Sequence, residues 1–431
     1  MIKNIIEEKK TLITYICMIC LIVLSVYTHG IGSILALAIF MLFAVNATTT
    51  ETLNILYGII PFANIFKIGP DSLSFLTLLE IITVGLYLCR TRRFKKTTLF
   101  WICVLTAGLV LEALNGFTIN LMIVIKHIVR IMLLSYITGD KSKPEDVMSI
   151  GFYFSISMIL SLAITNVQSF YLKVQPYLDM NVEMVNSVAV LRQSGLFNDP
   201  NYCSLALTMA FTLLLVLYKT GKINYEFWLL AAFLVPLGFM TYSKSYFLMM
   251  SALTMYLLLF VLLPKHRGMF IIAMVGVCVF IIQVSRGNVP VVNTLLQRFM
   301  TQDLTTGRMD LNEEFLSYIW GNTKVLFFGA GIAADRIAGV WNNVHNFYID
   351  YLYKFGIIGG LVFLFTLCSC FAPISNKISA RDDLVKLLPL ASMLIVYFFL
   401  AGINMFDFYY YVMISFFCLR INTPREETKR K

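Results

Sequence analysis

The stretch GMFIIAMVGVCVFIIQV, residues 268–284, decides what kind of protein this chain is. It contains no charged side chain, and Lys265, Arg267 and Arg286 stand close to its two ends. A run of this kind, close to the ~20 apolar residues that cross a bilayer as a helix, is typical of a transmembrane segment. Similar runs recur along the chain, so we take the bilayer to be the solvent for most of the protein.

The composition agrees with this interpretation. Of the 431 residues, 59% are hydrophobic and only 13% are charged, whereas a soluble domain has roughly 25% charged residues. This excludes a soluble globular protein, a disordered chain, a secreted protein and a nucleic-acid-binding protein. The formal net charge of +10 is therefore an orientation signal, with attraction to anionic lipids as its by-product.

The apolar runs predict an all-α polytopic membrane protein with about 13–14 transmembrane helices. Thirteen runs lie at about 11–28, 30–46, 71–89, 97–114, 117–137, 147–167, 201–218, 225–241, 246–263, 268–284, 347–371, 384–402 and 405–419. A further apolar segment at about 52–68 is broken by Pro61, and we expect it to be a kinked or re-entrant crossing.

The positive-inside rule gives the orientation. If the Pro61 segment crosses and both termini are cytoplasmic, 22 of the 34 Lys and Arg residues are cytoplasmic and 10 lie outside. Residues 1–431 then form one multi-span membrane domain with two long extracytoplasmic loops, 168–200 and 285–346, that contain short helices. Long connections in compact domains are usually functional, so we expect the functional site there.

The nine cysteines lie inside or at the edges of apolar runs, and the sequence predicts neither a disulfide framework nor a zinc site. Cys17 and Cys20 have redox-motif spacing, but they lie within the first hydrophobic segment, where packing is the better interpretation. The outer loops contain no acidic or histidine cluster for a divalent cation. We therefore predict no metal and no cofactor.

The first outer loop shows a helical pattern and then a helix start. Its apolar residues recur at helical spacing, at Leu178, Val182, Val185 and Ala189. This predicts a short amphipathic helix on the membrane surface, with Arg192 near its end. Gly195 then permits a turn, Asp199 can cap a helix, and Pro200 suits its first position. Arg192 is either a solvated charge or a functional cation, and spacing alone leaves both open.

The second outer loop predicts two short helices. The first has Val292, Leu295, Leu296 and Phe299 on its apolar face, with Arg298 beside it. The second, opened by Thr305, Thr306, Gly307 and Arg308, has Leu311, Phe315, Tyr318 and Ile319 on one face and Asp310, Glu313 and Glu314 on the other. A cation in a first helical turn opposes the helix dipole. Arg308 is therefore either a surface charge or part of a phosphate site built with free N–H groups.

His345 and Asn346 stand directly before the run 347–371. A histidine at a helix N-terminus tends to stay neutral, which suits a general base. The alternative is an amphipathic anchor at the membrane interface.

Several motifs together resemble the bacterial O-antigen ligase and polymerase family. His345-Asn346, followed by Gly356 and Gly359, is similar to the H-N-(nine)-G-x-x-G signature of that family. Two segments resemble its periplasmic-loop motifs, namely Arg192-x-x-Gly195 with Asp199-Pro200-Asn201, and Thr306-Gly307-Arg308 with the later Gly329-x-Gly331. Thr241-Tyr-Ser243-Lys244-Ser245 resembles its T-x-S-R segment, with Lys in place of Arg. The resemblance covers about 190–360, and the first 150 residues match only in hydropathy and topology.

The resemblance implies an inverting, metal-independent glycosyltransferase in the bacterial cytoplasmic (inner) membrane. Its donor would be a glycan on undecaprenyl pyrophosphate, and its product O-antigen or capsular polysaccharide; a chain-length regulator is a further expected partner. His345, Arg308 and Arg192 are the expected catalytic residues, with the arginines on the pyrophosphate and His345 as base or in acceptor positioning. Asn346, Arg298, Lys244 and Asn201 are expected to bind substrate, Asn346 through a sugar or backbone hydrogen bond. We favour a repeat-unit polymerase, and a ligase that transfers the glycan to another acceptor is the alternative.

A lipid-linked oligosaccharide flippase or secondary transporter is the rival from another class. Glu80, Lys126, His127 and Arg130 are ionisable residues inside predicted spans, where such groups are usually functional or paired. The basic residues either pair structurally with Glu80 or a lipid phosphate, or hold a polyprenyl carrier. The length of the loop 285–346 and the lack of an internal repeat argue against transport. Nothing positive supports a receptor or scaffold.

Overall fold

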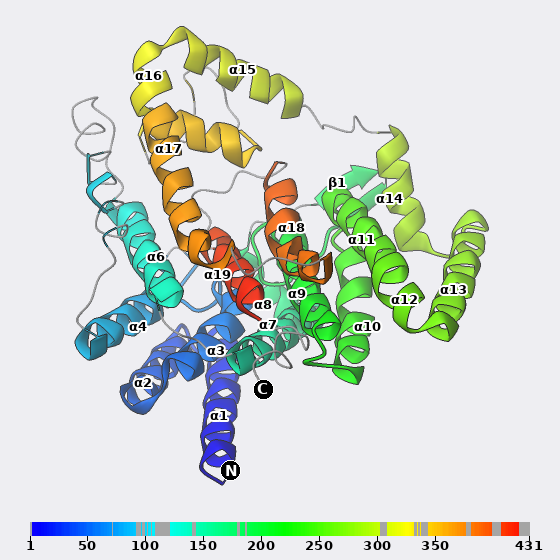
Figure 1. Cartoon of the computed structure of the whole chain (residues 1–431), viewed down its shortest axis with the longest axis horizontal. Coiled ribbons are helices and arrows are strands. Elements are labelled where there is room, and N and C mark those ends of the chain that lie inside the picture. Colours follow the sequence, from blue (N-terminus) through cyan, green and yellow to red (C-terminus); the bar gives the residue numbers. More distant parts are fainter. Residues whose placement is uncertain are drawn as a thin grey trace.

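The computed structural model describes residues 2–70, 72–91, 96, 100, 102–104, 106–107, 121–139, 144–178, 182–185, 188–301, 308–331, 334, 337, 344–375, 381–398 and 407–421. These residues form a helical bundle, which confirms the predicted all-α membrane fold (Figure 1). Four helices are long and apolar enough to cross a bilayer, at Val147–Thr165, Pro200–Lys219, Lys244–Leu262 and Arg267–Ser285. The predicted span at 97–114 lies largely outside the described residues.

The Pro61 segment crosses the bundle as a broken helix. The first elements are α1 (Ile2–Ser25), α2 (Ile31–Asn46), α3 (Thr49–Ile59), the 3-10 helix η1 (Ile60–Phe62) and α4 (Leu76–Thr91). Arg90 at the end of α4 donates to the carbonyls of Ala44 and Ala47, so α2 ends and α3 begins beside the end of α4. At the other face, Gly30 (φ 85°) approaches the backbone of Ile68 so closely that a Cβ would lie 2.4 Å from it. The chain between these two faces therefore completes a crossing.

The centre of the bundle is α9, in which every residue from Tyr202 to Leu217 is buried. Helix α9 spans Pro200–Lys219. The other elements of this part of the chain are α6 (Leu121–Gly139), α7 (Pro144–Thr165), α10 (Tyr225–Phe239), α11 (Lys244–Tyr256), the π-helical stretch η3 (Leu257–Leu262), α12 (Leu263–Lys265) and α13 (Arg267–Ser285). Helices α7, α10, α11 and α18 pack against α9. By contrast, α13 has no buried residue and stands apart from the bundle (Figure 1).

The amphipathic helix predicted over Leu178–Ala189 is wrong. The first outer loop contains α8 (Gln168–Val174) and the 3-10 helix η2 (Gln175–Tyr177), followed by the antiparallel strands β1 (Val182–Val185) and β2 (Val188–Leu191). Val182 pairs with Leu191, and Val185 with Val188. Four of the eight strand residues are valines, which favour extended backbone, and the two strands satisfy each other's backbone groups. This local hairpin pairing outweighs the helical spacing.

The second outer loop contains the two predicted helices, as α14 (Pro290–Thr301) and α15 (Arg308–Gly321), followed by α16 (Thr323–Phe328). In α15, Phe315 and Ile319 are buried while Asp310, Glu313 and Glu314 are exposed, as the pattern predicts.

The last elements are α17 (Phe347–Ser375), the 3-10 helix η4 (Arg381–Leu387), α18 (Leu388–Tyr397) and α19 (Asp407–Arg420). Helix α17 is not one straight span, because Gly356 has φ 65° and ψ −173°. The break separates a short outer piece from a longer piece that descends into the bundle (Figure 1).

The ends of both long connections lie on one face of the bundle. Asn64, on the same face as Gly30, donates from Nδ2 to the carbonyl of Leu196 at 2.9 Å. Strand β1 contacts α14, so the first loop touches the second. In Figure 1, α14, α15 and α16 lie at the end of the molecule away from the N-terminus. That this face is extracytoplasmic remains a prediction from the charge pattern.

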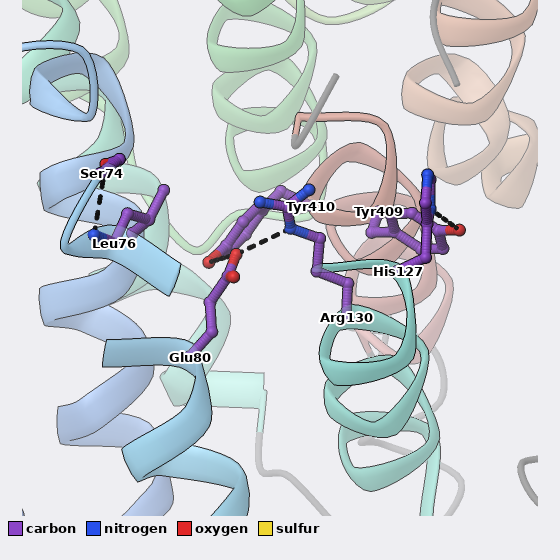
Figure 2. Close-up of polar contacts among 7 residues, drawn as sticks. All are labelled: Ser74, Leu76, Glu80, His127, Arg130, Tyr409 and Tyr410. Atoms are coloured by element: carbon purple, nitrogen blue, oxygen red, sulfur yellow. Dashed lines mark hydrogen bonds and ion pairs between the residues drawn. The ribbon is translucent and has the colours of Figure 1, made fainter. Parts of the chain in front are cut away.

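A buried polar network joins α4, α6 and α19 (Figure 2). Glu80 Oε1 accepts from Arg130 Nε at 3.0 Å and from the hydroxyl of Tyr410 at 3.0 Å. His127 Nδ1 and the Tyr409 hydroxyl form a hydrogen bond of 2.9 Å. Glu80 and Arg130 are 0% and 3% exposed. Arg130 therefore pairs with Glu80 as expected, whereas His127 pairs with Tyr409, and neither contact requires a transported ligand.

We expect an impermeant thiol reagent applied to intact cells to label Lys324→Cys on α16 and not Lys9→Cys on α1, in a background without the native cysteines. Both side chains are exposed and lie at opposite ends of the bundle. The charge asymmetry places Lys324 outside. Permeabilised cells, in which both variants should react, are the control. Labelling of Lys9→Cys alone would reverse the topology.

We expect Arg130→Met to lower the free energy of unfolding by about 3–5 kcal/mol, because it leaves the Glu80 carboxylate buried without its cation. Unfolding in detergent, followed by thermal or denaturant titration, measures the effect. The double variant Glu80→Gln, Arg130→Met should recover much of the loss. Arg286→Met, at an exposed arginine, is the matched control. Equal effects at Arg130 and Arg286 would contradict a structural ion pair.

Candidate active site

Arg192 fastens the end of the first outer loop to the α10–α11 turn. Its Nε donates to the carbonyl of Thr241 at 3.1 Å, and the backbone N–H of the next residue, Gln193, donates to the carbonyl of Met240 at 3.1 Å. The side chain of Arg192 is half-buried. The guanidinium is therefore held at a fixed position at the outer end of α11.

Asn201 in the first turn of α9 orients Arg192. Its side-chain oxygen accepts from Arg192 Nη2 at 3.0 Å and from the hydroxyl of Ser243 at 3.0 Å. Asp199 caps the helix by accepting from the backbone N–H of Asn201 at 2.6 Å, as the sequence predicts. Two protein donors therefore occupy the side-chain oxygen of Asn201, one of them from Arg192.

The turn Thr241-Tyr242-Ser243 sets the start of α11. The Thr241 hydroxyl donates to the carbonyl of Gly238 at 2.7 Å, and Tyr242 adopts a left-handed conformation with φ 51°. Ser243 caps α11 by accepting from the N–H of Tyr246. Lys244 is half-buried and is the first residue of α11. Its positive charge therefore opposes the dipole of α11, as that of Arg308 opposes the dipole of α15.

Asn346 caps α17. Its Oδ1 accepts from the backbone N–H groups of Tyr348 at 3.0 Å and Ile349 at 3.3 Å, and the residue is 2% exposed. The expected backbone hydrogen bond of Asn346 is therefore present, and its hydrogen bond to a sugar stays a prediction. The cap leaves His345 immediately outside the helix and half-buried.

The charged groups that act on His345 come from two segments distant in the sequence. Burial lowers the pKa of His345 below its usual value, the positive charge of Arg308 lowers it further, and the negative charge of Asp199 raises it. Arg308 at the start of α15 and Asp199 at the start of α9 therefore each lie within electrostatic range of His345 at the start of α17. The net effect keeps the imidazole neutral near pH 7, so it can accept a proton.

Gly329, which follows α16, and Gly356 in α17 allow close backbone contact between the end of α16 and α17. The N–H groups of Ala330 and Gly331 donate to the carbonyls of Tyr353 and Lys354 at 2.7 and 3.1 Å. A Cβ at Gly329 would lie 2.1 Å from the Lys354 carbonyl oxygen, and one at Gly356 would lie 2.5 Å from the backbone of Phe327. This junction fixes the outer piece of α17 and with it His345.

Residues 228–364 match the model of the O-antigen ligase family. The resemblance to the O-antigen polymerase and ligase family is thereby confirmed over this segment. No curated protein and no solved structure matches the chain significantly. The family match supports a membrane enzyme of O-antigen biosynthesis in the inner membrane, with lipid-linked glycans as substrates.

The matched O-antigen ligase segment contains Lys244, Arg298, Arg308, His345 and Asn346. Arg192 and Asn201 lie outside it, yet hydrogen bonds attach them to its Thr241 and Ser243. The tertiary structure therefore joins residues from outside the matched segment to those inside it.

Two parts of the family's expected site are incompletely described. Arg298 lies on α14, but its side chain is outside the described residues, as are Thr305, Thr306 and Gly307.

In the part of the chain that is described, no group of three or more His, Cys, Asp and Glu residues could hold a metal ion.

The sequence analysis missed an ion pair within the outer piece of α17. Lys354 Nζ lies 3.0 Å from Asp350 Oδ1, and both residues are buried. Their spacing of four residues, acidic first, is the favourable order for a helical ion pair and could have predicted it. Because the backbone of Lys354 also accepts from Gly331, the pair stabilises the piece that positions His345.

Proposed function

We propose that this protein joins undecaprenyl-pyrophosphate-linked oligosaccharide repeat units into a polysaccharide by glycosyl transfer at the outer face of the inner membrane. The observation that supports this most is the neutral, half-buried His345 within electrostatic range of Arg308 and Asp199. A base beside a guanidinium is the pair that such a transfer requires.

In the proposed reaction, a hydroxyl oxygen of the acceptor sugar bonds to the anomeric carbon of the donor. The hydroxyl proton passes to an imidazole nitrogen of His345. The bond between the anomeric carbon and the phosphate oxygen breaks, and undecaprenyl pyrophosphate leaves with the electron pair. A single displacement inverts the anomeric centre, and guanidinium groups stabilise the leaving charge without a metal ion.

The proposed roles differ between the residues. Arg308 and Arg192 would contact the pyrophosphate, because their planar forks suit phosphate oxygens. Lys244 and Arg298 would add positive charge for the same anion. Asn201 and Asn346 would hold Arg192 and the start of α17 in place.

Polymerisation is preferred over ligation because ligation to lipid A core requires a two-membrane cell, and polymerisation does not. Purified protein in liposomes, given lipid-linked repeat units alone, should yield a ladder of polysaccharide lengths. A product that forms only after lipid A core is added would establish the ligase instead. Control of the modal length by a chain-length regulator is part of the same proposal and would appear as a changed ladder on co-reconstitution.

We expect Arg308→Lys to lower turnover in this assay by about 10- to 100-fold, because the ammonium keeps the charge but loses the bidentate geometry. Expression and the unfolding temperature should stay at wild-type values. Arg286→Lys, an exposed arginine on the same face, should have no effect. Full activity of Arg308→Lys would leave Arg308 as a surface charge.

We expect the rate to fall as the imidazole of His345 becomes protonated, at a pH below its ordinary pKa of ~6.5. Asp199→Asn keeps a good helix cap but removes the charge that raises the pKa, so the acid limb should move to lower pH. Arg308→Gln removes the charge that lowers the pKa and should move the limb to higher pH. Rates measured from pH 4.5 to 8 test both shifts.

His345→Ala should reduce turnover by roughly two to four orders of magnitude. If His345 only positions the acceptor, His345→Gln would keep much of the activity and the acid limb would persist. A near-wild-type Ala variant would eliminate both roles.

A further inference from the structure

A polar cavity lies at the face of the bundle opposite to the candidate active site. Its volume is about 530 Å³, and its charged and aromatic lining comprises Tyr218, Lys219, Lys222, Tyr225, Glu226 and His266. Helix α9 begins at Pro200, beside Asp199, and ends at Lys219. Its 20 residues span ~30 Å, about the hydrocarbon thickness, so the cavity lies at the other membrane surface.

Pro264 explains the position of Lys219 in this cavity. A proline has no N–H, so Pro264 leaves the carbonyl of Phe260 without its usual helical donor. Lys219 Nζ donates to that carbonyl at 3.0 Å. The same stretch, Leu257–Leu262, is π-helical, a form often found at functional sites. The end of α9 is thereby tied to the α11–α13 corner across the cavity.

The α9–α10 turn places Lys222 beside Lys219. Gly221 adopts φ 72°, and the N–H of Lys222 donates to the carbonyl of Leu217 at 2.9 Å, the arrangement of a Schellman cap. One oxygen of the Glu226 carboxylate already has a partner, because Oε2 accepts a hydrogen bond from the backbone N–H of Asn224 at 2.9 Å. Two lysines and one carboxylate therefore line the cavity.

An apolar surface leads away from this polar cavity. Helix α13 starts directly after His266 and has no buried residue, and Met269, Ile271 and Ile272 in its first turns are exposed. Tyr218 and Tyr225 are amphipathic side chains of the kind enriched at membrane interfaces. A ligand with a phosphate at one end and acyl chains at the other matches both parts of this surface.

We propose that the cavity binds the headgroup of an anionic glycerophospholipid, with the phosphate at Lys219 and Lys222 and the acyl chains along α13. Glu226 faces the hydroxyls of a phosphatidylglycerol headgroup as a hydrogen-bond acceptor. Basic pockets between transmembrane helices bind anionic headgroups in this way. From this corner, α13 leads to α14 and the second outer loop at the opposite face of the bundle.

The test measures lipid binding to the full-length, delipidated protein, by native mass spectrometry with titrated phosphatidylglycerol, phosphatidylcholine and inorganic phosphate. We expect preferential retention of phosphatidylglycerol, and a roughly 10- to 30-fold weaker affinity in Lys219→Gln, Lys222→Gln. The control Lys9→Gln, Lys10→Gln removes two exposed lysines at the same end of the bundle, outside the cavity, and should bind as wild type. Equal retention of both lipids, or equal loss in both double variants, would overturn the proposal.

Two further variants keep the result interpretable. Lys219→Arg retains a donor for the Phe260 carbonyl and should keep the lipid, whereas Lys222→Gln alone should weaken binding without loss of that hydrogen bond. Binding of inorganic phosphate alone, with no preference among lipids, would show an anion site and refute the lipid. No glycan substrate enters the measurement, so its outcome is independent of the proposed glycosyl transfer.

Discussion

Hydrocarbon offers no hydrogen-bond partner, so a backbone group of this chain that leaves a helix inside the bilayer must find one within the protein. The exceptions to regular helix obey this constraint at specific positions. Pro264 frees the carbonyl of Phe260, and Lys219 takes it. The backbone beside the break at Gly356 pairs with the segment after Gly329. Each of these replacement hydrogen bonds fixes a corner of the bundle, one at each membrane face.

The candidate active site follows from the way helices begin at one of these faces. Arg308 opens α15 and Lys244 opens α11, although a cation in the first turn is electrostatically unfavourable there. A bound anion reverses this penalty, since it meets both the free N–H groups and the cations. The proposed phosphate-bearing substrate would account for this placement.

Hydrogen bonds, a helix cap and an ion pair hold the candidate site residues in place. Asn201 fixes Arg192, Asn346 caps the helix that follows His345, and the buried pair of Asp350 and Lys354 stiffens that helix. None of these polar groups needs to touch the substrate to affect the reaction. The network of Glu80, Arg130 and Tyr410 holds helices together inside the bundle. These buried charges are therefore consistent with a structural role rather than with transport.

Local sequence determined the elements whose stabilising groups are close together in the chain. Apolar length predicted the spans, Asp199 predicted the cap of α9, and the pattern of Phe315 and Ile319 predicted the buried face of α15. The same reasoning failed at Val182–Leu191, because the pairing of β1 with β2 outweighs an apolar spacing that also suits a helix. Only the tertiary structure decided that Arg192 meets Thr241, that Arg130 meets Glu80, and that His345 lies near Arg308 and Asp199. Those contacts join residues 37 to 146 positions apart, and helix packing, which no local pattern encodes, brings them together.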